Sequence, residues 1–511
     1  MAVTTFLRRS LSVQRGGTVA LISWGIVGLV FVRLCVAWAG PLANDEAYYW
    51  LWSRHLAAGY YDHPPMVAVL IRLSTAIFGD TPFGIRALSV LLGLVASWAV
   101  WRATVALYAS ETLGAFAALY FNLTLFAAAG TVIVTPDAPL LVASAFVLLF
   151  LAKVLQTGRG GWWLAVGAAA GLALVSKYTA LFFGLGIVLW LLWEPALRRW
   201  LWTPWPYLGG LVALAIFAPV LLWNAGHDWI SFLKQGARVG IRGDFTLRYL
   251  GEHFAAQFGM ATPSVLVLGL MGLFAMLRGQ GGPRAARLLI AVLIWPLALY
   301  FLWHAIHSRV EGNWTAPLIP AFAVAAAVAA HRIDWRGRSA QVAGLARRSA
   351  VPVGLGLAGL IYLQAVFGMV PAGVADPTAR QLGAGWPALA ARIDALRREA
   401  GARGVLGTNY GTVGWLAFYL PDRPPVVQVN ERIRWIDAPE PDPALFEGAV
   451  LYVCKAPCAE SETVTGKFER VARPVTLPRL RRGGVIEEYL VWRLAGLQGD
   501  LLDRCPPPEL R

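Results

Sequence analysis

The stretch Asn44-Asp45-Glu46-Ala47-Tyr48-Tyr49-Trp50 follows the first long apolar segment, and Tyr60-Tyr61-Asp62-His63-Pro64-Pro65 lies shortly after it. Adjacent carboxylates repel and raise each other's pKa, so it is costly to hold Asp45 and Glu46 side by side. Three features would explain the pair: a role as a base, a cation partner or a bound metal. The alternative is a solvated loop whose Tyr and Trp residues belong to an interfacial aromatic belt. The positions of the remaining polar residues distinguish these interpretations.

The composition is that of a membrane protein. Of 511 residues, 58% are hydrophobic and 14% are charged, whereas a soluble globular chain has about a quarter charged residues. The net charge of +15 is spread through short loops between apolar runs, a pattern typical of the positive-inside bias and not of a phosphate-binding face. We therefore expect no nucleic-acid partner.

Apolar segments recur from residue 18 to residue 370. Because each span needs about 20 apolar residues, we expect about eleven spans, with the residues before the first span (18–38) in the cytoplasm. Residues 39–84 are then an external loop. Loops assigned to the inside are basic, whereas those assigned to the outside carry polar residues of both charge signs. This sorting predicts one active, periplasmic face in a bacterial inner-membrane protein.

The composition changes at about residue 371. An amphipathic helical stretch at 386–400 is followed by strand-like runs at 404–409, 425–429, 449–453 and 485–492. The predicted fold is thus an α-helical polytopic membrane domain at 1–370 and a soluble periplasmic α/β domain at 371–511. Within the latter, Cys454 and Cys458 suit a disulfide in an oxidising compartment, since two Cys are too few for a metal site.

Several external residues have both a functional and a structural interpretation. Asp137 either caps the next helix or has a chemical role, and Lys177 either snorkels or binds an anion. Arg309 either pairs with Glu311 or grips a phosphate in forked geometry. Arg33 lies inside the first span, where it is costly if it faces lipid.

Together these residues are carboxylates that can activate a hydroxyl and cations that can hold a phosphate at the membrane–water interface. A lipid-linked sugar phosphate fits that combination. The predicted reaction is direct, inverting displacement at the anomeric carbon, with a carboxylate as general base and cations that stabilise the departing phosphate.

The motifs resemble those of the integral-membrane glycosyltransferases of the C-type fold. The similar group is the bacterial family-39-like one, which contains the dolichyl-phosphate-mannose protein mannosyltransferases and the lipid A aminoarabinose transferase. The motifs that carry the resemblance are the two stretches quoted above, Thr135-Pro136-Asp137-Ala138-Pro139, Ser176-Lys177-Tyr178 and Arg309-Val310-Glu311-Gly312-Asn313-Trp314.

The resemblance implies roles for individual positions. Asp45 matches the catalytic base, with Glu46 beside it, Asp137 matches a second acidic residue, and Lys177 matches a lysine that contacts the donor phosphate. Asp62-His63 falls where the aminoarabinose transferase has Glu-Lys, so His63 takes over the phosphate role of that lysine. The remaining expected substrate-binding residues are Tyr48, Tyr61, Arg238, Arg309 and Glu311.

A divalent metal is compatible with the sequence but not required by it. The region around Arg238 corresponds to one that supplies a metal-ligand His in the aminoarabinose transferase, and here Gln235 stands near the expected place.

The sequence thus predicts a glycosyltransferase that moves one sugar from a polyprenyl-phosphate donor to a cell-envelope acceptor. The acceptor is lipid A or its core, another lipid, O-antigen or a protein, and the sequence does not choose among them. The alternative from another class is a transporter or flippase of lipid-linked sugars, which would need inverted repeats and polar residues near mid-membrane.

Overall fold

The computed structural model describes residues 2–239, 245–370 and 373–503. The chain separates into two compact units, which we call the helical unit (residues 1–35 and 86–359) and the mixed unit (residues 36–85 and 360–511). Residues 36–85 thus belong to the same compact unit as the C-terminal region. The predicted domain division at residue 370 stays a prediction.

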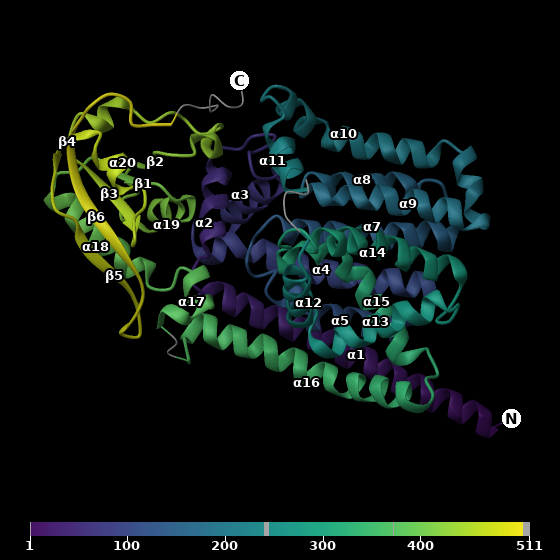
Figure 1. Ribbon diagram of the computed structural model, residues 1–511. Helices are drawn as coiled ribbons and strands as arrows, with labels where there is room; N and C mark the ends of the chain where they lie inside the picture. The colour runs from purple at the N-terminus through teal and green to yellow at the C-terminus, as the bar shows by residue number, and fades with distance from the viewer. Residues whose placement is uncertain (1, 240–244, 371–372, 504–511) are drawn as a thin grey trace. The chain divides into compact units, whose positions relative to one another are not determined.

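The helical unit is built from long apolar helices (Figure 1). Its elements, three of which extend into the mixed unit at one end, are α1 (Ala2–Ala39), α4 (Pro82–Tyr108), α5 (Glu111–Leu123), α6 (Leu125–Ala128), α7 (Asp137–Thr157), α8 (Trp162–Leu174), η1 (Tyr178–Ala180), α9 (Leu181–Trp193), η2 (Pro195–Trp202), α10 (Trp205–Ala225), α11 (Ile230–Val239), α12 (Arg248–Met260), α13 (Pro263–Leu277), α14 (Arg284–Ala305), η3 (Gly312–Leu318), α15 (Ile319–His331) and α16 (Gly337–Phe367).

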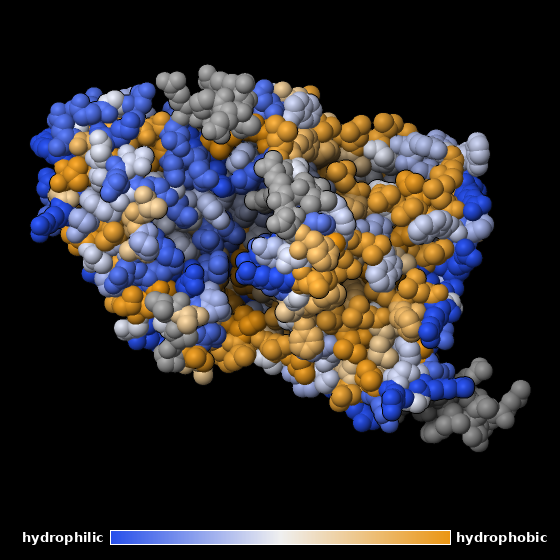
Figure 2. Space-filling view, viewed as in Figure 1, coloured by the Kyte–Doolittle hydropathy of each residue, from blue (hydrophilic) through white to orange (hydrophobic). Residues whose placement is uncertain are grey.

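In the described ranges, seven helices are long and apolar enough to span a membrane, or up to nine if each of two bent pairs counts as one span. The prediction of an α-helical polytopic membrane protein is confirmed, whereas the number of about eleven spans is not. One reason is that the predicted segment 113–134 is interrupted at Thr124, whose hydroxyl caps the short helix α6. Side chains on the visible surface over α8, α10 and α14 are mostly hydrophobic (Figure 2).

Two features explain how these helices pack. The backbones of α8 and α10 approach so closely at Gly167 and Gly209 that a Cβ on either residue would collide with the other helix, as is usual where small residues line membrane helix interfaces. Arg33 in α1 is buried, and its guanidinium donates to the side-chain and backbone oxygens of Asn122 at 2.8 and 3.0 Å. This pairing removes the cost of an arginine that faces lipid.

The mixed unit combines short helices with a six-stranded sheet. Its elements are α2 (Asn44–Arg54), α3 (Met66–Phe78), η4 (Gly373–Ala375), α17 (Pro377–Gln381), α18 (Trp386–Glu399), β1 (Val405–Gly407), α19 (Tyr410–Tyr419), β2 (Val426–Gln428), η5 (Arg432–Trp435), η6 (Pro443–Phe446), β3 (Val450–Lys455), α20 (Ser461–Thr465), β4 (Phe468–Val471), β5 (Val475–Arg481) and β6 (Gly484–Leu497).

The sheet has the order β2-β1-β3-β6-β4, and β5 pairs with β6. Strand β1 is parallel to β2 and to β3, with Val405 opposite both Val426 and Leu451, whereas β6 runs antiparallel to its neighbours. The four predicted strands and helix 386–400 are confirmed as β1, β2, β3, β6 and α18. The predicted disulfide is also present, between Cys454 and Cys458.

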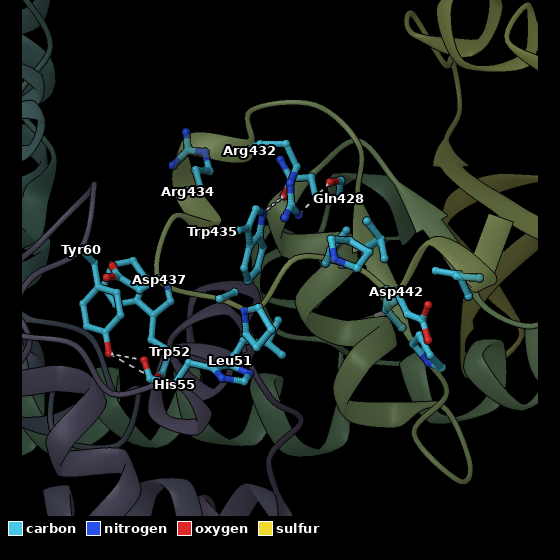
Figure 3. A pocket seen from close by; sticks show the side chains of 18 residues that line it. Leu51, Trp52, His55, Tyr60, Gln428, Arg432, Arg434, Trp435, Asp437 and Asp442 are labelled. Carbon is cyan, nitrogen blue, oxygen red and sulfur yellow. Dashed lines mark hydrogen bonds between the residues drawn. The ribbon is translucent and has the colours of Figure 1, made fainter. Parts of the chain in front are cut away.

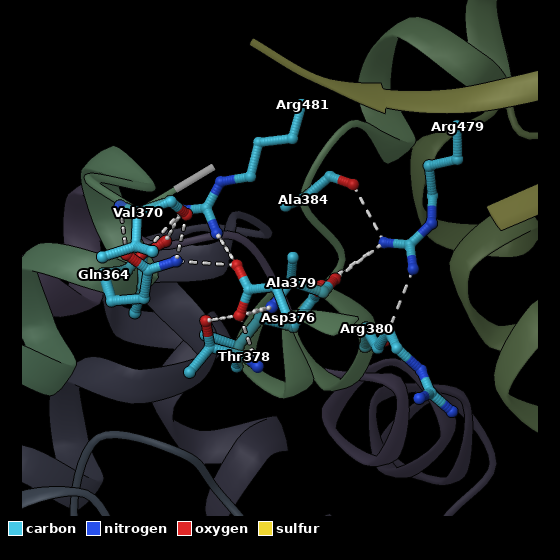
Figure 4. Close-up of polar contacts among 11 residues, drawn as sticks. Gln364, Val370, Asp376, Thr378, Ala379, Arg380, Ala384, Arg479 and Arg481 are labelled. Carbon is cyan, nitrogen blue, oxygen red and sulfur yellow. Dashed lines mark hydrogen bonds and ion pairs between the residues drawn. The ribbon is translucent and has the colours of Figure 1, made fainter. Parts of the chain in front are cut away.

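An arginine clamp fixes the end of α16 that belongs to the mixed unit (Figure 4). Arg481 donates to the backbone oxygens of Gln364 and Ala365, each at 2.6 Å, and pairs with Asp376 at 3.3 Å. Asp376 also caps α17 through the backbone N–H of Thr378. Because the last carbonyls of a helix lack partners within it, this clamp gives the Ala365 carbonyl a donor, and it adds a second donor to the Gln364 carbonyl, which also accepts the N–H of Gly368.

Candidate active site

Helix α2 carries the adjacent acidic residues Asp45 and Glu46, and Glu46 has a structural role at the start of the helix. Glu46 is fully buried, and its carboxylate accepts the backbone N–H of Ala43 at 2.9 Å, which closes one side of a capping box. This bond satisfies a donor that the helix itself leaves unpaired. Glu46 thus supports the helix, and its catalytic role stays a prediction.

Asp45 is half-buried and receives a hydrogen bond from a distant part of the chain. The hydroxyl of Tyr410, the first residue of α19, donates to Asp45 Oδ1 at 3.1 Å. Burial raises the pKa of Asp45 above its usual value, the Tyr410 hydrogen bond works against that rise, and the charges of Asp62 and Glu46 add to it. A carboxylate with a raised pKa is a stronger base than an exposed one.

Asp62 lies in the same unit and is held from two sides. Its Oδ2 accepts the hydroxyl of Tyr48 at 2.9 Å and the guanidinium of Arg434 at 2.5 Å. Burial works to lower the pKa of Arg434, but the charges of Asp62 and Glu431 outweigh it and raise that pKa. The buried carboxylate of Asp62 therefore has a permanent cation beside it.

Aromatic rings connect these two carboxylates. The ring of Tyr48 lies 4.8 Å from that of Tyr410 and 5.3 Å from that of Trp435, between centroids. Arg434 lies over the ring of Tyr61 at 5.9 Å, and His63 is 6.4 Å from Tyr49. The structure thus brings together Asp45, Asp62, Tyr48, Tyr61 and His63, as the sequence predicted for the first external loop. We call Asp45, Asp62, Tyr48, Tyr410 and Arg434 the carboxylate cluster.

Sequence reasoning missed Tyr410 and Arg434, the two C-terminal members of this cluster. They lie 365 and 372 residues from their partners, so no local pattern links them. The sequence does contain one indication of the contact between α19 and α2, namely the glycines Gly411 and Gly414. A Cβ on Gly414 would lie 2.9 Å from the backbone nitrogen of Tyr48, and one on Gly411 would lie 3.0 Å from Cβ of Asn44. Small residues at this spacing allow the backbones of α19 and α2 to touch.

A cavity of about 350 Å³ adjoins the carboxylate cluster (Figure 3). Arg434, which pairs with Asp62, is one of its lining residues, and Trp435 and Trp52 form part of its wall. Trp52 is stacked on Tyr60, with ring centroids 4.1 Å apart. Its aromatic wall and few polar groups are typical of small-molecule pockets.

The helical unit contains a second group of predicted site residues. Asp137 is the first residue of α7, and its two carboxylate oxygens accept Lys177 Nζ at 2.7 Å and Asn313 Nδ2 at 2.6 Å. The side chains of Asp137 and Lys177 are only 8% and 11% exposed. We call this group the Asp137 triad. Asn313 was part of a quoted motif, but its contact with Asp137 was not predicted.

The other predicted substrate-binding residues are more exposed. The side chain of Arg309 is 66% exposed and lies 3.4 Å from Glu252 and 4.0 Å from Glu311, so the predicted pairing with Glu311 is the looser of the two. Arg238 is in α11, but its side chain lies outside the described part of the structure. Their substrate roles stay predictions.

The described residues contain one group of His, Cys, Asp or Glu side chains with the spacing of a metal site, namely Cys454, Cys458 and Glu460. Because the two sulfur atoms form a disulfide, they are not thiolate ligands. This group therefore does not fit a metal.

The fold is that of the C-type membrane glycosyltransferases, as the motifs suggested. The chain superimposes with a TM-score of 0.64 on ArnT from Cupriavidus metallidurans bound to undecaprenyl phosphate, over 94% of this chain and 99% of that one, at 18% identity. Residues 62–223 match the family described as dolichyl-phosphate-mannose-protein mannosyltransferase. The resemblance predicted from the sequence is confirmed.

Two curated proteins match part of this chain. The chain is 30% identical over 304 residues to the lipid A galacturonosyltransferase RgtD of Rhizobium johnstonii, across 56% of this chain and 62% of that protein. It is 28% identical over 236 residues to undecaprenyl phosphate-alpha-4-amino-4-deoxy-L-arabinose arabinosyl transferase 1 of Pseudomonas fluorescens, across 42% of this chain and 40% of that protein. The chain thus spans less than two thirds of the length of either relative.

Proposed function

We propose that this protein is a membrane glycosyltransferase that moves a single sugar from a polyprenyl-phosphate donor to a cell-envelope acceptor, on the periplasmic face of the bacterial inner membrane. Lipid A is the first acceptor to test, because the RgtD relative is named for it. The observation that carries the proposal is Asp45. It is a half-buried carboxylate whose pKa is raised, bonded to Tyr410 and close to the buried Asp62–Arg434 pair.

In the proposed reaction the acceptor hydroxyl oxygen attacks the anomeric carbon of the donor sugar. The bond from that carbon to the phosphate oxygen breaks, the hydroxyl proton passes to Asp45, and the polyprenyl phosphate leaves with its electron pair. Configuration inverts at the anomeric carbon. General base catalysis of this kind contributes about 10²–10⁴-fold to a rate.

The phosphate roles of Lys177, His63 and Arg309 are part of the proposal. Lys177 supports it chemically, because an ammonium has three donors and the bond to Asp137 uses one of them. The transporter alternative gains no support from the two curated relatives, both of which are named as transferases.

The test is mass spectrometry of envelope lipids from four strains: the wild type, a deletion, and the deletion complemented with either wild type or Asp45→Asn. We expect one sugar mass to disappear from one acceptor class in the deletion and to return only with the wild-type gene. An unchanged profile in the deletion, with no accumulation of the polyprenyl-phosphate sugar, would refute the transferase.

A further inference from the structure

The order of the parallel strands in the mixed unit creates a topological switch point. From β1 the chain passes through α19 to β2 on one side, and β3 then pairs with the other side of β1. Where successive connections leave in opposite directions, a crevice opens outside the carboxyl ends of the strands. In open α/β sheets ligands bind in such crevices.

A cavity of about 390 Å³ lies at this point. Thr408 and Asn409, which follow β1, and Cys454 and Lys455, which end β3, are among its lining residues. Thr412 in the first turn of α19 also contributes. The cavity is thus enclosed by the ends of the two strands that the switch point separates, and we call it the switch-point crevice.

The charges that line the switch-point crevice balance. Lys455 pairs with Glu487 at 2.6 Å, and Glu487 is also held by Arg479 at 2.6 Å from outside the lining. Arg380 and Glu460 are the other charged lining residues, and neither makes an ion pair with another residue that the structure describes. The site offers donors and acceptors without an excess of either charge, which suits an uncharged ligand with several hydroxyl groups.

Aromatic lining residues also suit a sugar ligand. Tyr489 is buried and 1% exposed, whereas Trp415 is 5% exposed, so Trp415 offers the aromatic edge against which a sugar ring can pack. Asn44 also lines the crevice, and its side-chain amide makes no hydrogen bond within the described ranges. Asn44 directly precedes Asp45 at the start of α2, and the lining residue Asn409 directly precedes Tyr410, which donates to Asp45.

We propose that the switch-point crevice binds an uncharged sugar ring of the acceptor glycan and presents the acceptor to Asp45. This inference rests on the proposed function, because it names the acceptor subsite of that same reaction. Hydroxyl and amide groups of the ring exchange hydrogen bonds with Arg380, Glu460 and Thr408, and Trp415 supports the ring. The loop that contains Pro457 forms one wall and is closed by the Cys454–Cys458 disulfide.

The test uses the full-length protein in detergent and two variants that avoid the carboxylate cluster. These are the double variant Arg380→Ala/Glu460→Ala, which removes two charged groups without breaking an ion pair, and Thr408→Val, which keeps the side-chain shape. Glu462→Ala, an exposed change on the neighbouring helix α20, is the matched control. Saturation-transfer NMR with the disaccharide of N-acetylglucosamine measures binding, and steady-state kinetics with lipid A measures transfer.

We expect the double variant to lose at least about tenfold in disaccharide affinity and to raise the acceptor KM by a similar factor, the effect of about one or two lost hydrogen bonds. The donor KM and the control should change less than about twofold. Binding unaltered by either variant, or a donor KM that rises with the acceptor KM, would overturn the inference. Variant-sensitive binding in a protein without transferase activity would support the crevice and refute the proposed function.

Discussion

The carboxylate cluster and the Asp137 triad both contain a buried carboxylate paired with a cation, Asp62 with Arg434 and Asp137 with Lys177, but the cluster also contains Asp45, whose hydrogen bonding differs from that of Asp137. In the triad, both oxygens of Asp137 have strong donors, Lys177 and Asn313, at 2.6–2.7 Å. In the cluster, Asp45 has one longer bond to an uncharged phenol, and burial raises its pKa. A carboxylate that is fully bonded is held in place, whereas one with a free lone pair and a raised pKa is available to take a proton. On the proposed function, this difference gives Asp45 the chemical role and Asp137 a positioning role.

The largest expected effect tests this assignment. Asp45→Asn removes the proton acceptor, so transfer should fall by about 10³-fold or more. Because burial disfavours the charged form of Asp45, the neutral amide should leave the unfolding temperature at neutral pH unchanged or higher. Transfer assays with the purified protein and thermal unfolding measure both. Activity within tenfold of the wild type would remove Asp45 from the base role.

The next effect concerns the cation of the cluster. Arg434→Ala leaves Asp62 buried without its charge partner, a loss of about 3–5 kcal/mol for a buried pair. Both the unfolding temperature and transfer should drop. Arg423→Ala is the matched control, because it breaks the exposed Arg423–Asp80 pair in the same unit, which is worth about 0–1 kcal/mol. Equal losses in the two variants would contradict the buried role of Arg434.

Substitutions of Lys177 and Asp137 in the Asp137 triad should be coupled in their effects on stability, and they should not remove the proton acceptor of the proposed reaction. Lys177→Met and Asp137→Asn should each destabilise the protein, and the double variant should recover part of the loss, with an interaction energy of about 0.5–3 kcal/mol. Thermal unfolding of the four proteins gives this cycle. If Lys177 also binds the donor phosphate, Lys177→Met raises the donor KM more than the acceptor KM. Additive losses would mean that the pair does not act as a unit.

A smaller effect is expected on the pH dependence of transfer, through the hydrogen bond from Tyr410 to Asp45. The Tyr410 hydroxyl stabilises ionised Asp45, so Tyr410→Phe should raise the pKa of Asp45 further. The acidic limb of the pH–rate profile should then shift to higher pH, by about one unit at most for a hydrogen bond of about 0.5–1.5 kcal/mol. At pH well above this limb, the rate should change little. A shift to lower pH would exclude the proposed role of Tyr410.

The smallest effect is expected at Arg309, whose side chain is exposed and loosely paired. Arg309→Ala should change stability by less than about 1 kcal/mol and transfer by about twofold. A tenfold rise in the donor KM, measured by varying the donor at saturating acceptor, would instead establish the phosphate grip that the sequence suggested for this residue.

The parts that the sequence predicted are those with local causes. Apolar runs identify membrane helices, and the alternation of strand-like runs with Pro, Gly and Asp identifies β1, β2, β3 and β6. The strands β4 and β5 were not predicted, because many of their residues are exposed and their hydrophobic pattern is therefore weak. Helix α19 was not predicted either. Its sequence, YGTVGWLAFY, contains two glycines and many aromatic residues, which are poor helix formers outside their tertiary context.

The candidate site divides in the same way. The first-loop residues Asp45, Asp62 and Tyr48 lie close together in sequence and were grouped correctly by spacing. Their partners Tyr410 and Arg434, and the bond from Asn313 to Asp137, depend on contacts across hundreds of residues. Such contacts follow from the packing of whole units, which a single sequence does not specify.

The contact between α2 and α19 also sets when the carboxylate cluster can form during synthesis. Asp45 is synthesised 365 residues before Tyr410, and Asp62 is synthesised 372 residues before Arg434. Because Tyr410 and Arg434 come so late relative to their partners, the carboxylate cluster stays incomplete until α19 has been made and packs through Gly411 and Gly414 against α2. A chain that ended before residue 410 would carry all the described helices of membrane-spanning length but would lack Tyr410 and Arg434. The carboxylate cluster therefore forms only after every described helix of membrane-spanning length has been made.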